Sequence, residues 1–332
     1  MIEISVIIVY RNEERYIIDC IHSIEEQFEQ NSISWELILV DGESTDNSTQ
    51  LINEYMDTKR IPFQIINNKK KFLAAGWNLG IKAAKGKYVL RPDAHAKLHP
   101  NYISNGLETL KQKPDVTAVG GLLETKAKGF WGQIIKVALS SRVGVGNSSF
   151  RTATKSDYSD TAVYAIYRKE IFDKTGYFDE KLVRHQDNNM HKRIKNAGGL
   201  FFMNVNMKAD YFARDSVKKL LKQMFLIGYY LPDVMGDGAV GLRHLAPFAF
   251  YLVLLVNGIL HFLNIPYFGY LAILQFGLYL LAISIDSFGK VISRKSPSLL
   301  LNIAIIPLMH FFYAEGTFMG LIRKSFKKKA ID

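Results

Sequence analysis

The chain has 332 residues, of which 42 are Lys or Arg and 31 are Asp or Glu, so its formal net charge is +11 and its pI is near 9.4. With 48% hydrophobic and 22% charged residues, the composition is that of a globular protein of about two domains, which excludes a disordered or collagen-like chain. The single cysteine, Cys20, excludes an intramolecular disulfide and a cysteine-based zinc site.

Apolar runs alternate with amphipathic stretches over residues 2–202. This βαβαβαβ order predicts a parallel sheet wrapped by helices. Because ligands bind beyond the carboxyl ends of such strands, the polar residues after each strand are expected to share one crevice. The predicted elements are strand 4–9, helix 14–26, strand 35–40, helix 44–56, strand 64–67, helix 76–84 and strand 88–91.

The mean hydropathy of +0.01 hides an apolar C-terminal part, since Leu245 to Phe288 contains one formally charged residue, Asp286. Residues 245–263 and 268–288 are each long enough to cross a hydrocarbon core of about 30 Å, and we predict two spans. Residues 298–322 include Pro307, His310 and Glu315, which favour an interfacial or re-entrant segment. The alternative is a soluble protein with a very hydrophobic helical subdomain.

Basic residues flank these apolar segments, in the loop 289–297 and in a tail that includes Arg323, Lys324 and Lys327–Lys329. Basic loops favour the cytoplasm, so both regions are predicted on the side of the N-terminal domain. A helix that begins near Asp215 or Ser216 has apolar and lysine-rich faces, which suits a membrane surface or, equally, packing on the sheet.

The crevice is expected to hold two groups of carboxylates. Asp41 and Asp46 lie between a strand and a helix, where a nucleotide can bind, although taken alone they can also be read as a turn residue and a first-turn helix carboxylate. Asp93 and His95 follow the strand that ends at Arg91, and alternate residues of an extended segment point the same way. Their oxygen and nitrogen ligands suit Mn²⁺ or Mg²⁺. An Asp turn with a surface His is the alternative for this second pair.

The order of these motifs resembles the inverting family 2 glycosyltransferases, and within them the succinoglycan-type branch of membrane-bound exopolysaccharide enzymes. The resemblance covers nearly the whole chain. It implies a GT-A fold, meaning a Rossmann-like mixed α/β sheet flanked by helices, here followed by a C-terminal helical membrane region. The motifs are Ser5–Glu14, Val40–Asp46, Asn78–Gly80, Gly86–Tyr88, Arg91–Ala96, Gly144–Asn147, Asp160–Thr161, Gly176–Glu180 and Arg184–Asp187.

The resemblance implies a role for each matching residue. Asp93 and His95 would bind the divalent metal, Mn²⁺ or Mg²⁺, at the position of the family's Asp-x-Asp motif. Asp187 would be the catalytic base, although it can also be read as the N-cap of a helix that ends near Gly198. The residues implied in binding the nucleotide-sugar, which is expected to be uridine-linked, are Tyr10, Asn12, Glu13, Asp41, Asp46, Asn78 and Asp93.

Two positions depart from the family's pattern. His95 stands in place of the second Asp of Asp-x-Asp, and Asn189 stands where related sequences have an acid. These departures keep open a second hypothesis, a non-catalytic membrane-bound module that binds a sugar nucleotide or a lipid-linked glycan within an assembly complex. Processive relatives have a Gln-x-x-Arg-Trp motif, whereas Gln223 is followed by Met-Phe-Leu-Ile, so transfer of one sugar per encounter is expected.

The resulting prediction is a hexosyltransferase of the plasma (inner) membrane whose acceptor is a polyprenyl-diphosphate-linked saccharide of exopolysaccharide or capsule synthesis. Its other partners are the nucleotide-sugar and membrane lipids, and a homo-oligomer is compatible with the sequence. A dinucleotide fingerprint and a P-loop are absent, and the placement of the basic residues argues against nucleic acid. The expected regions are a cytoplasmic catalytic domain at 1–212, an interfacial helix and linker at 213–244, and a membrane region at 245–332.

Overall fold

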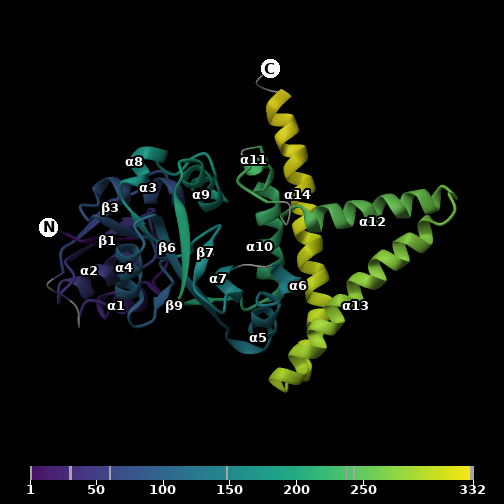
Figure 1. The fold of residues 1–332 in the computed structure, drawn as a ribbon, viewed down its shortest axis with the longest axis horizontal. Coiled ribbons are helices and arrows are strands. Elements are labelled where there is room, and N and C mark those ends of the chain that lie inside the picture. The colour runs from purple at the N-terminus through teal and green to yellow at the C-terminus, as the bar shows by residue number, and fades with distance from the viewer. Residues whose placement is uncertain are drawn as a thin grey trace. The chain divides into compact units, whose positions relative to one another are not determined.

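The structure is a computed structural model that describes residues 2–29, 32–59, 61–146, 149–236, 238–241 and 244–329. It divides the chain into two compact units, shown in Figure 1. The first unit comprises Met1–Thr125 and Ser149–Phe212, and the second comprises Lys126–Ser148 and Ala213–Asp332. Asn147, part of one motif named above, lies outside the described residues.

The first unit is built on one mixed sheet with the strand order β3-β2-β1-β4-β8-β6-β9-β5, and β7 pairs with β9. Strands β1 to β4 run parallel to one another, whereas β8 lies antiparallel to both β4 and β6. The strands are β1 (Ile4–Tyr10), β2 (Trp35–Asp41), β3 (Phe63–Asn67), β4 (Tyr88–Leu90), β5 (Lys97–Leu98), β6 (Val116–Lys126), β7 (Asp157–Ser159), β8 (Ile166–Arg168) and β9 (Leu200–Phe212).

Helices cover both faces of this sheet, because alternate residues of each buried strand point to opposite sides. Ile8 of β1 belongs to a core with α1 (Ile17–Glu25), α2 (Ser48–Met56) and α4 (Tyr102–Gln112). Its neighbour Ile7 belongs to a second core with α3 (Leu73–Ala83), α8 (Ile171–Thr175) and α9 (Gln186–Asn196). A short helix, α7 (Ser149–Thr152), completes the unit.

All seven predicted elements of the opening βαβαβαβ pattern are present, and the predicted mixed α/β fold is confirmed. Two helices begin later than predicted, α1 at Ile17 instead of 14 and α2 at Ser48 instead of 44. The residues before them are used in hydrogen bonds between two loops, described below. Helix α3 begins three residues earlier than predicted, at Leu73.

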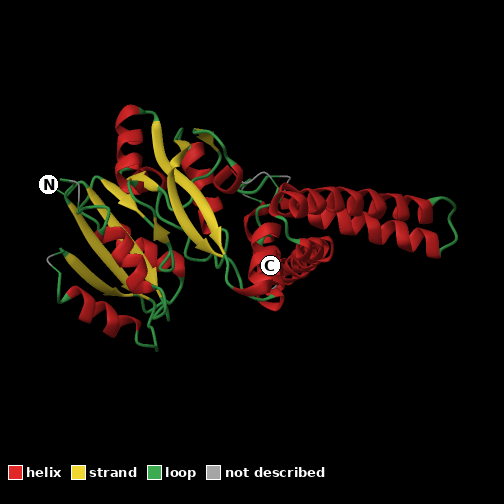
Figure 2. Cartoon of the chain, turned by 90° about the horizontal axis from the view of Figure 1, so that it is seen from below, coloured by secondary structure: helices red, strands yellow, loops and turns green. Residues whose placement is uncertain are grey.

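The second unit is helical, and Figure 2 shows its long helices in red. Helix α10 packs along α14, and α12 contacts both α13 and α14. The predicted cap of α10 is confirmed, since the Ser216 hydroxyl accepts a hydrogen bond from the backbone N–H of Lys219. The helices are α5 (Gly129–Ala138), α6 (Arg142–Val145), α10 (Val217–Tyr230), α11 (Pro232–Met235), α12 (Ala246–Phe262), α13 (Phe268–Arg294), η2 (Pro297–Leu301) and α14 (Asn302–Lys329).

Two helical segments are long and apolar enough to cross a membrane by length and composition, Phe268–Arg294 and Pro297–Phe326. Ala246–Phe262, at 17 residues, is a shorter apolar helix. The helix predicted over 268–288 extends to Arg294, and the segment predicted over 298–322 continues as one helix through Pro307 to Lys329. Many apolar side chains of α12 and α13 are exposed, among them Leu255, Ile273 and Ile285.

Candidate active site

The ends of β1 and β2 bring two predicted site residues together. Tyr10 and Asp41 are the last residues of these parallel strands and are partners in the register of the sheet. The hydroxyl of Thr49 donates a hydrogen bond to Asp41 Oδ2 at 3.2 Å and lies 3.0 Å from the hydroxyl oxygen of Tyr10. Burial raises the pKa of Tyr10 to about 12, so its hydroxyl is neutral. These three side chains form a polar group at the carboxyl edge of the sheet.

The loops that follow β1 and β2 are tied together by side chains that the sequence also identified. Asn12, in the left-handed region with φ 57°, accepts a hydrogen bond from the Thr45 N–H at 2.7 Å. Asp46 accepts hydrogen bonds from the N–H groups of Glu14 and Ser48. Asp46 therefore precedes helix α2 instead of lying in its first turn. Both residues shape the loops, and their contact with a nucleotide stays a prediction.

Asp93 lies after β4 and forms an isolated β-bridge with Val9 at the end of β1. Its carboxylate accepts a hydrogen bond from the Tyr164 hydroxyl at 3.3 Å. Burial raises the pKa of Asp93 above its usual range, and the nearby charges of His95 and Arg91 lower it only in part. His95 Nδ1 lies 3.4 Å from the carboxylate oxygen Oε1 of Glu13. The predicted residues Glu13, Asp93 and His95 therefore meet at the same edge of the sheet.

These residues fit a divalent cation. The half-buried carboxylate of Asp93, whose pKa is raised mainly by desolvation, gains stability when a positive charge is placed beside it. Asp93 and Glu13 offer hard oxygen ligands and His95 a nitrogen ligand, which is a donor set that Mn²⁺ accepts.

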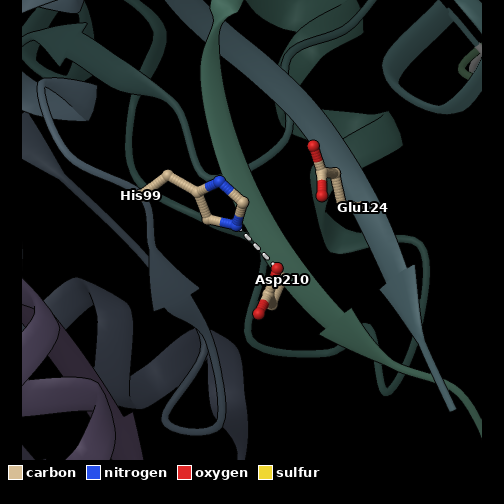
Figure 3. A group of neighbouring side chains, drawn as sticks. All are labelled: His99, Glu124 and Asp210. Carbon is tan, nitrogen blue, oxygen red and sulfur yellow. Dashed lines mark hydrogen bonds and ion pairs between the residues drawn. The ribbon is translucent and has the colours of Figure 1, made fainter.

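A second group with suitable ligands, His99, Glu124 and Asp210, lies near β5, β6 and β9 (Figure 3), with ligand atoms within 4.8 Å of one another. The imidazole Nε2 of His99 is 2.7 Å from Asp210 Oδ1. Lys208 Nζ lies 3.6 Å from Glu124 Oε1. Because both carboxylates already have a basic partner, this group needs a cation less than the half-buried Asp93 does.

Asp187 lies in the first turn of α9 and is paired with Arg91, whose guanidinium donates a hydrogen bond to Asp187 Oδ1. The side chain of Arg91 is 5% exposed and that of Asp187 is 48% exposed, so the carboxylate can meet a ligand while the guanidinium cannot. Burial contributes most to raising the pKa of Asp93, and the negative charge of Asp187 also raises it. The structure thus brings the predicted base to the predicted metal residue.

The alternative interpretation of Asp187 as an N-cap is wrong. The N-cap position of α9 is His185, which has φ 62°, and Asp187 is two residues further on. Asn189 is buried, and its side-chain oxygen accepts a hydrogen bond from Nε of Arg193 at 3.1 Å. An amide at position 189 therefore has a structural contact within α9.

Asn78 also has contacts within the protein. Its side chain is buried, and its amide group makes hydrogen bonds of 2.9 Å to the backbone N–H and C=O of Phe178 and to Glu180 Oε1. These contacts hold the segment 178–180 against α3. A contact between Asn78 and the nucleotide stays a prediction, and the described contacts do not support it.

Sequence reasoning did not assign site roles to Thr49, Trp77, Arg91 or Phe178. The guanidinium carbon of Arg91 lies 3.5 Å from the ring centroid of Trp77 and 4.9 Å from that of Phe178. The sequence gives one signal for the cluster of Arg91, Trp77 and Phe178, which is the position of Arg91 two residues before Asp93. The pairing with Asp187, 96 positions away, comes from the fold.

Comparison with known proteins agrees with this fold. Residues 5–176, slightly more than half of the chain, match the family described as Glycosyl transferase family 2. The fold is that of the sugar-transferring α/β enzymes, and this chain belongs to glycosyl transferase family 2. The predicted family is therefore confirmed.

Two curated relatives are similar to this chain. One is the dolichyl N-acetyl-alpha-D-glucosaminyl phosphate 3-beta-D-2,3-diacetamido-2,3-dideoxy-beta-D-glucuronosyltransferase of Methanococcus voltae, 29% identical over 331 residues, which cover 96% of this chain and 97% of the relative. The other is the succinoglycan biosynthesis protein ExoA of Rhizobium meliloti, 24% identical over 196 residues, or 58% of each chain.

Among solved structures, the mannosyltransferase PcManGT of Pyrobaculum calidifontis, in complex with GDP-Man and Mn²⁺, has a TM-score of 0.63 at 14% identity. The match covers 96% of this chain and 87% of that chain. The likeness extends over nearly the whole of this chain and confirms the GT-A fold.

Proposed function

We propose that this glycosyltransferase moves one sugar from a nucleotide-sugar to a polyprenyl-linked saccharide, with inversion at the anomeric carbon. The donor we propose is a UDP-hexose or UDP-N-acetylhexosamine. The observation that carries the proposal is that Asp41 and Asp93 lie at the carboxyl edge of the sheet, where ligands bind in open α/β folds, and that Asp187 is paired with Arg91, two residues before Asp93.

The donor would bind along the ends of β1, β2 and β4. Tyr10 and Asp41, which both contact the Thr49 hydroxyl, would hold the base and ribose. Asn12, Glu13 and Asp46 shape the neighbouring loops. A divalent metal, Mn²⁺ or Mg²⁺, held by Asp93 and His95, would neutralise the negative charge that develops on the departing diphosphate.

Asp187 would act as the general base. As the acceptor oxygen forms its bond to the anomeric carbon, the hydroxyl proton passes to the Asp187 carboxylate. The bond from that carbon to the diphosphate oxygen breaks, and its electron pair leaves with the diphosphate. A base on the face opposite the leaving group gives inversion, and the 48% exposure of Asp187 leaves room for an acceptor.

The acceptor class is supported by the Methanococcus voltae relative, whose name specifies a dolichyl-phosphate-linked sugar and which matches nearly the full length of this chain. We therefore propose a polyprenyl phosphate- or diphosphate-linked saccharide. The exopolysaccharide or capsule role rests on the similarity to the succinoglycan protein. The absence of a Gln-x-x-Arg-Trp motif after Gln223 supports transfer of one sugar per encounter.

A membrane location is part of the proposal. Helices α13 and α14 are long and apolar enough to span, and α10 presents Lys218, Lys219 and Lys222 to solvent. Lysines at a membrane surface attract anionic lipids and a lipid-linked phosphate. We propose that residues 1–212 form the cytoplasmic catalytic domain, 213–244 an interfacial helix and linker, and 245–332 the membrane region of a plasma-membrane enzyme.

The test is release of UDP from a panel of UDP-sugars by detergent-purified protein, with Mn²⁺ or Mg²⁺, in the presence and absence of a short polyprenyl-diphosphate-sugar. Release that needs the acceptor and is lost in Asp187→Asn supports the proposal. Binding of a UDP-sugar without release on any acceptor would favour a binding module instead.

A further inference from the structure

Arg91 is a buried cation. Its side chain is 5% exposed, and its Nε is a buried donor without a hydrogen-bond partner among the described residues. Burial of a charge is costly unless it is paired. Burial acts to lower the pKa of Arg91, but the carboxylate of Asp187 contributes most to raising it, so the guanidinium stays charged.

Two aromatic rings fix the plane of this guanidinium. Its central carbon lies 3.5 Å from the ring centroid of Trp77 and 4.9 Å from that of Phe178, distances at which a cation is attracted to the face of an aromatic ring. The two rings contact each other, with centroids 5.0 Å apart. A planar, delocalised cation packs against these two rings better than the tetrahedral ammonium of lysine does.

Hydrogen bonds hold the two rings in place around the guanidinium. Asn78 is the neighbour of Trp77 on α3, and its side-chain amide bonds both the N–H and the C=O of Phe178. This pairing fixes the backbone of Phe178 relative to Trp77. Chain segments about 100 residues apart are thus combined to hold one guanidinium, and the only carboxylate to which the described hydrogen bonds join it is Asp187.

We infer that Arg91 is a positioning residue for the transfer reaction, which holds the Asp187 carboxylate in the orientation from which it takes the acceptor proton. The inference rests on the proposed function, since it assigns Arg91 to the base of that reaction. In this interpretation the guanidinium is kept in place by Trp77, Phe178 and Asn78. Arg91 itself is too deeply buried to touch the acceptor.

The first test measures kcat and KM for transfer with Arg91→Lys and Arg91→Met. Both variants are expected to lose about 100-fold in kcat, the size of effect that follows from a misplaced catalytic group, with KM for the donor within about 3-fold of wild type. Arg168→Lys is the matched control, because the Arg168 side chain bonds backbone carbonyls of the same unit, those of Leu110, Lys113 and Val116. An unchanged kcat in folded Arg91→Met would overturn the inference.

A double-mutant cycle separates positioning from a merely structural role. In the Asp187→Asn background, Arg91→Met is expected to cause no further loss of kcat, because the group that it positions is gone. Losses that multiply in the double variant would count against the inference. Guanidinium ion added to Arg91→Ala is expected to restore part of kcat by binding against Trp77 and Phe178 in place of the lost side chain.

Failure of the proposed function gives a different pattern. If Asp187→Asn retains transfer, Asp187 is not the base, and the positioning role inferred for Arg91 is wrong as well. If Asp187→Asn is inactive while Arg91→Met is active, the inference alone is wrong. Crystal structures of wild type and Arg91→Met decide the matter without activity, since a displaced Asp187 carboxylate supports positioning and an unmoved one overturns it.

Discussion

The imidazole Nε2 of His191 lies 2.8 Å from the hydroxyl oxygen of Tyr167, and its Nδ1 lies 2.8 Å from the hydroxyl oxygen of Thr161. His191 is one turn after Asp187 on α9 and is buried. Burial lowers the pKa of His191 to about 4, so the ring is neutral in the folded protein at pH 7. It packs against Phe201, with ring centroids 4.5 Å apart. The turn that carries Asp187 is therefore fixed by a neutral histidine.

This arrangement predicts a pH-dependent stability. The unfolded chain takes up a proton at His191 near pH 6.5 and the folded chain only near pH 4, so the free energy of unfolding falls as the pH falls through this window. The loss due to this residue is about 3 kcal/mol by pH 4. His191→Gln, which does not titrate, is expected to flatten this part of the curve in chemical denaturation from pH 7 to 4. Equal slopes for wild type and variant would contradict the prediction.

Asp187→Asn is expected to abolish transfer while the donor still binds. A general base contributes about 100- to 10,000-fold to rate, so kcat should fall by at least about 100-fold, with the Kd of UDP within about 3-fold of wild type. The variant also removes the carboxylate that is paired with the buried Arg91, which should lower the free energy of unfolding by about 2 kcal/mol. Transfer assays, UDP titration and thermal unfolding measure the three quantities. Unchanged turnover would remove Asp187 from the mechanism.

Asp93→Asn tests the metal site, with His99→Gln as the matched control from the second group of ligands. Because burial disfavours the Asp93 carboxylate, the asparagine variant is expected to be slightly more stable than wild type in EDTA. Added Mn²⁺ should raise the melting temperature of wild type and of His99→Gln but not that of Asp93→Asn. The opposite pattern, with the Mn²⁺ response lost only in His99→Gln, would place the metal at His99, Glu124 and Asp210.

Thr49→Val tests whether the hydroxyl between Tyr10 and Asp41 aligns them for the nucleotide. The substitution keeps the shape but removes the hydrogen bond to Asp41. A bond of this kind is worth about 1.5 kcal/mol, so the Kd of the UDP-sugar should rise about 10-fold, with little change in kcat. Thr58→Val, at an exposed hydroxyl that bonds only the C=O of Tyr55, is the control. Isothermal titration with the UDP-sugar measures both variants, and an affinity of Thr49→Val equal to that of wild type would exclude Thr49 from the site.

The parts of the fold that follow local patterns could be predicted from the sequence. The strand at 4–10 is a continuous apolar run, and buried parallel strands require such runs. The first helices begin three or four residues later than predicted because Asn12, Glu13 and Asp46 take part in hydrogen bonds between the loops. Side-chain to backbone bonds of this kind compete with helix formation and leave no periodic signal.

Some features of the candidate site could likewise be predicted from the sequence, and others could not. Asp41 and Asp93 follow predicted strands, so their neighbourhood could be inferred from the topology of the sheet. The pairing of Arg91 with Asp187 could not, because it depends on the packing of α3, α9 and the segment at Phe178, far apart in sequence. The amide of Asn78, assigned to the nucleotide from a motif, is used in that same packing.

The contact between α10 and α14 predicts a sharp difference between two glycines of the second unit. A Cβ at Gly316 would lie 2.1 Å from the backbone oxygen of Phe225, whereas a Cβ at Gly289 would have no atom within 4 Å. Helices that approach this closely need small residues at the contact. Gly316→Ala should therefore push α10 from α14 and cost about 1 to 3 kcal/mol, the usual range for overpacking.

The measurement is thermal unfolding of the two variants in detergent. Gly289→Ala, on the open face of α13, is expected to melt no lower than wild type. The new Cβ meets no other atom, and alanine is a better helix former than glycine. Gly316→Ala should melt several degrees lower. Because the lysine face of α10 is part of the proposed membrane surface, Gly316→Ala should also weaken binding to vesicles that contain anionic lipid, whereas Gly289→Ala should not. Equal melting temperatures would show that the α10–α14 contact does not stabilise the second unit.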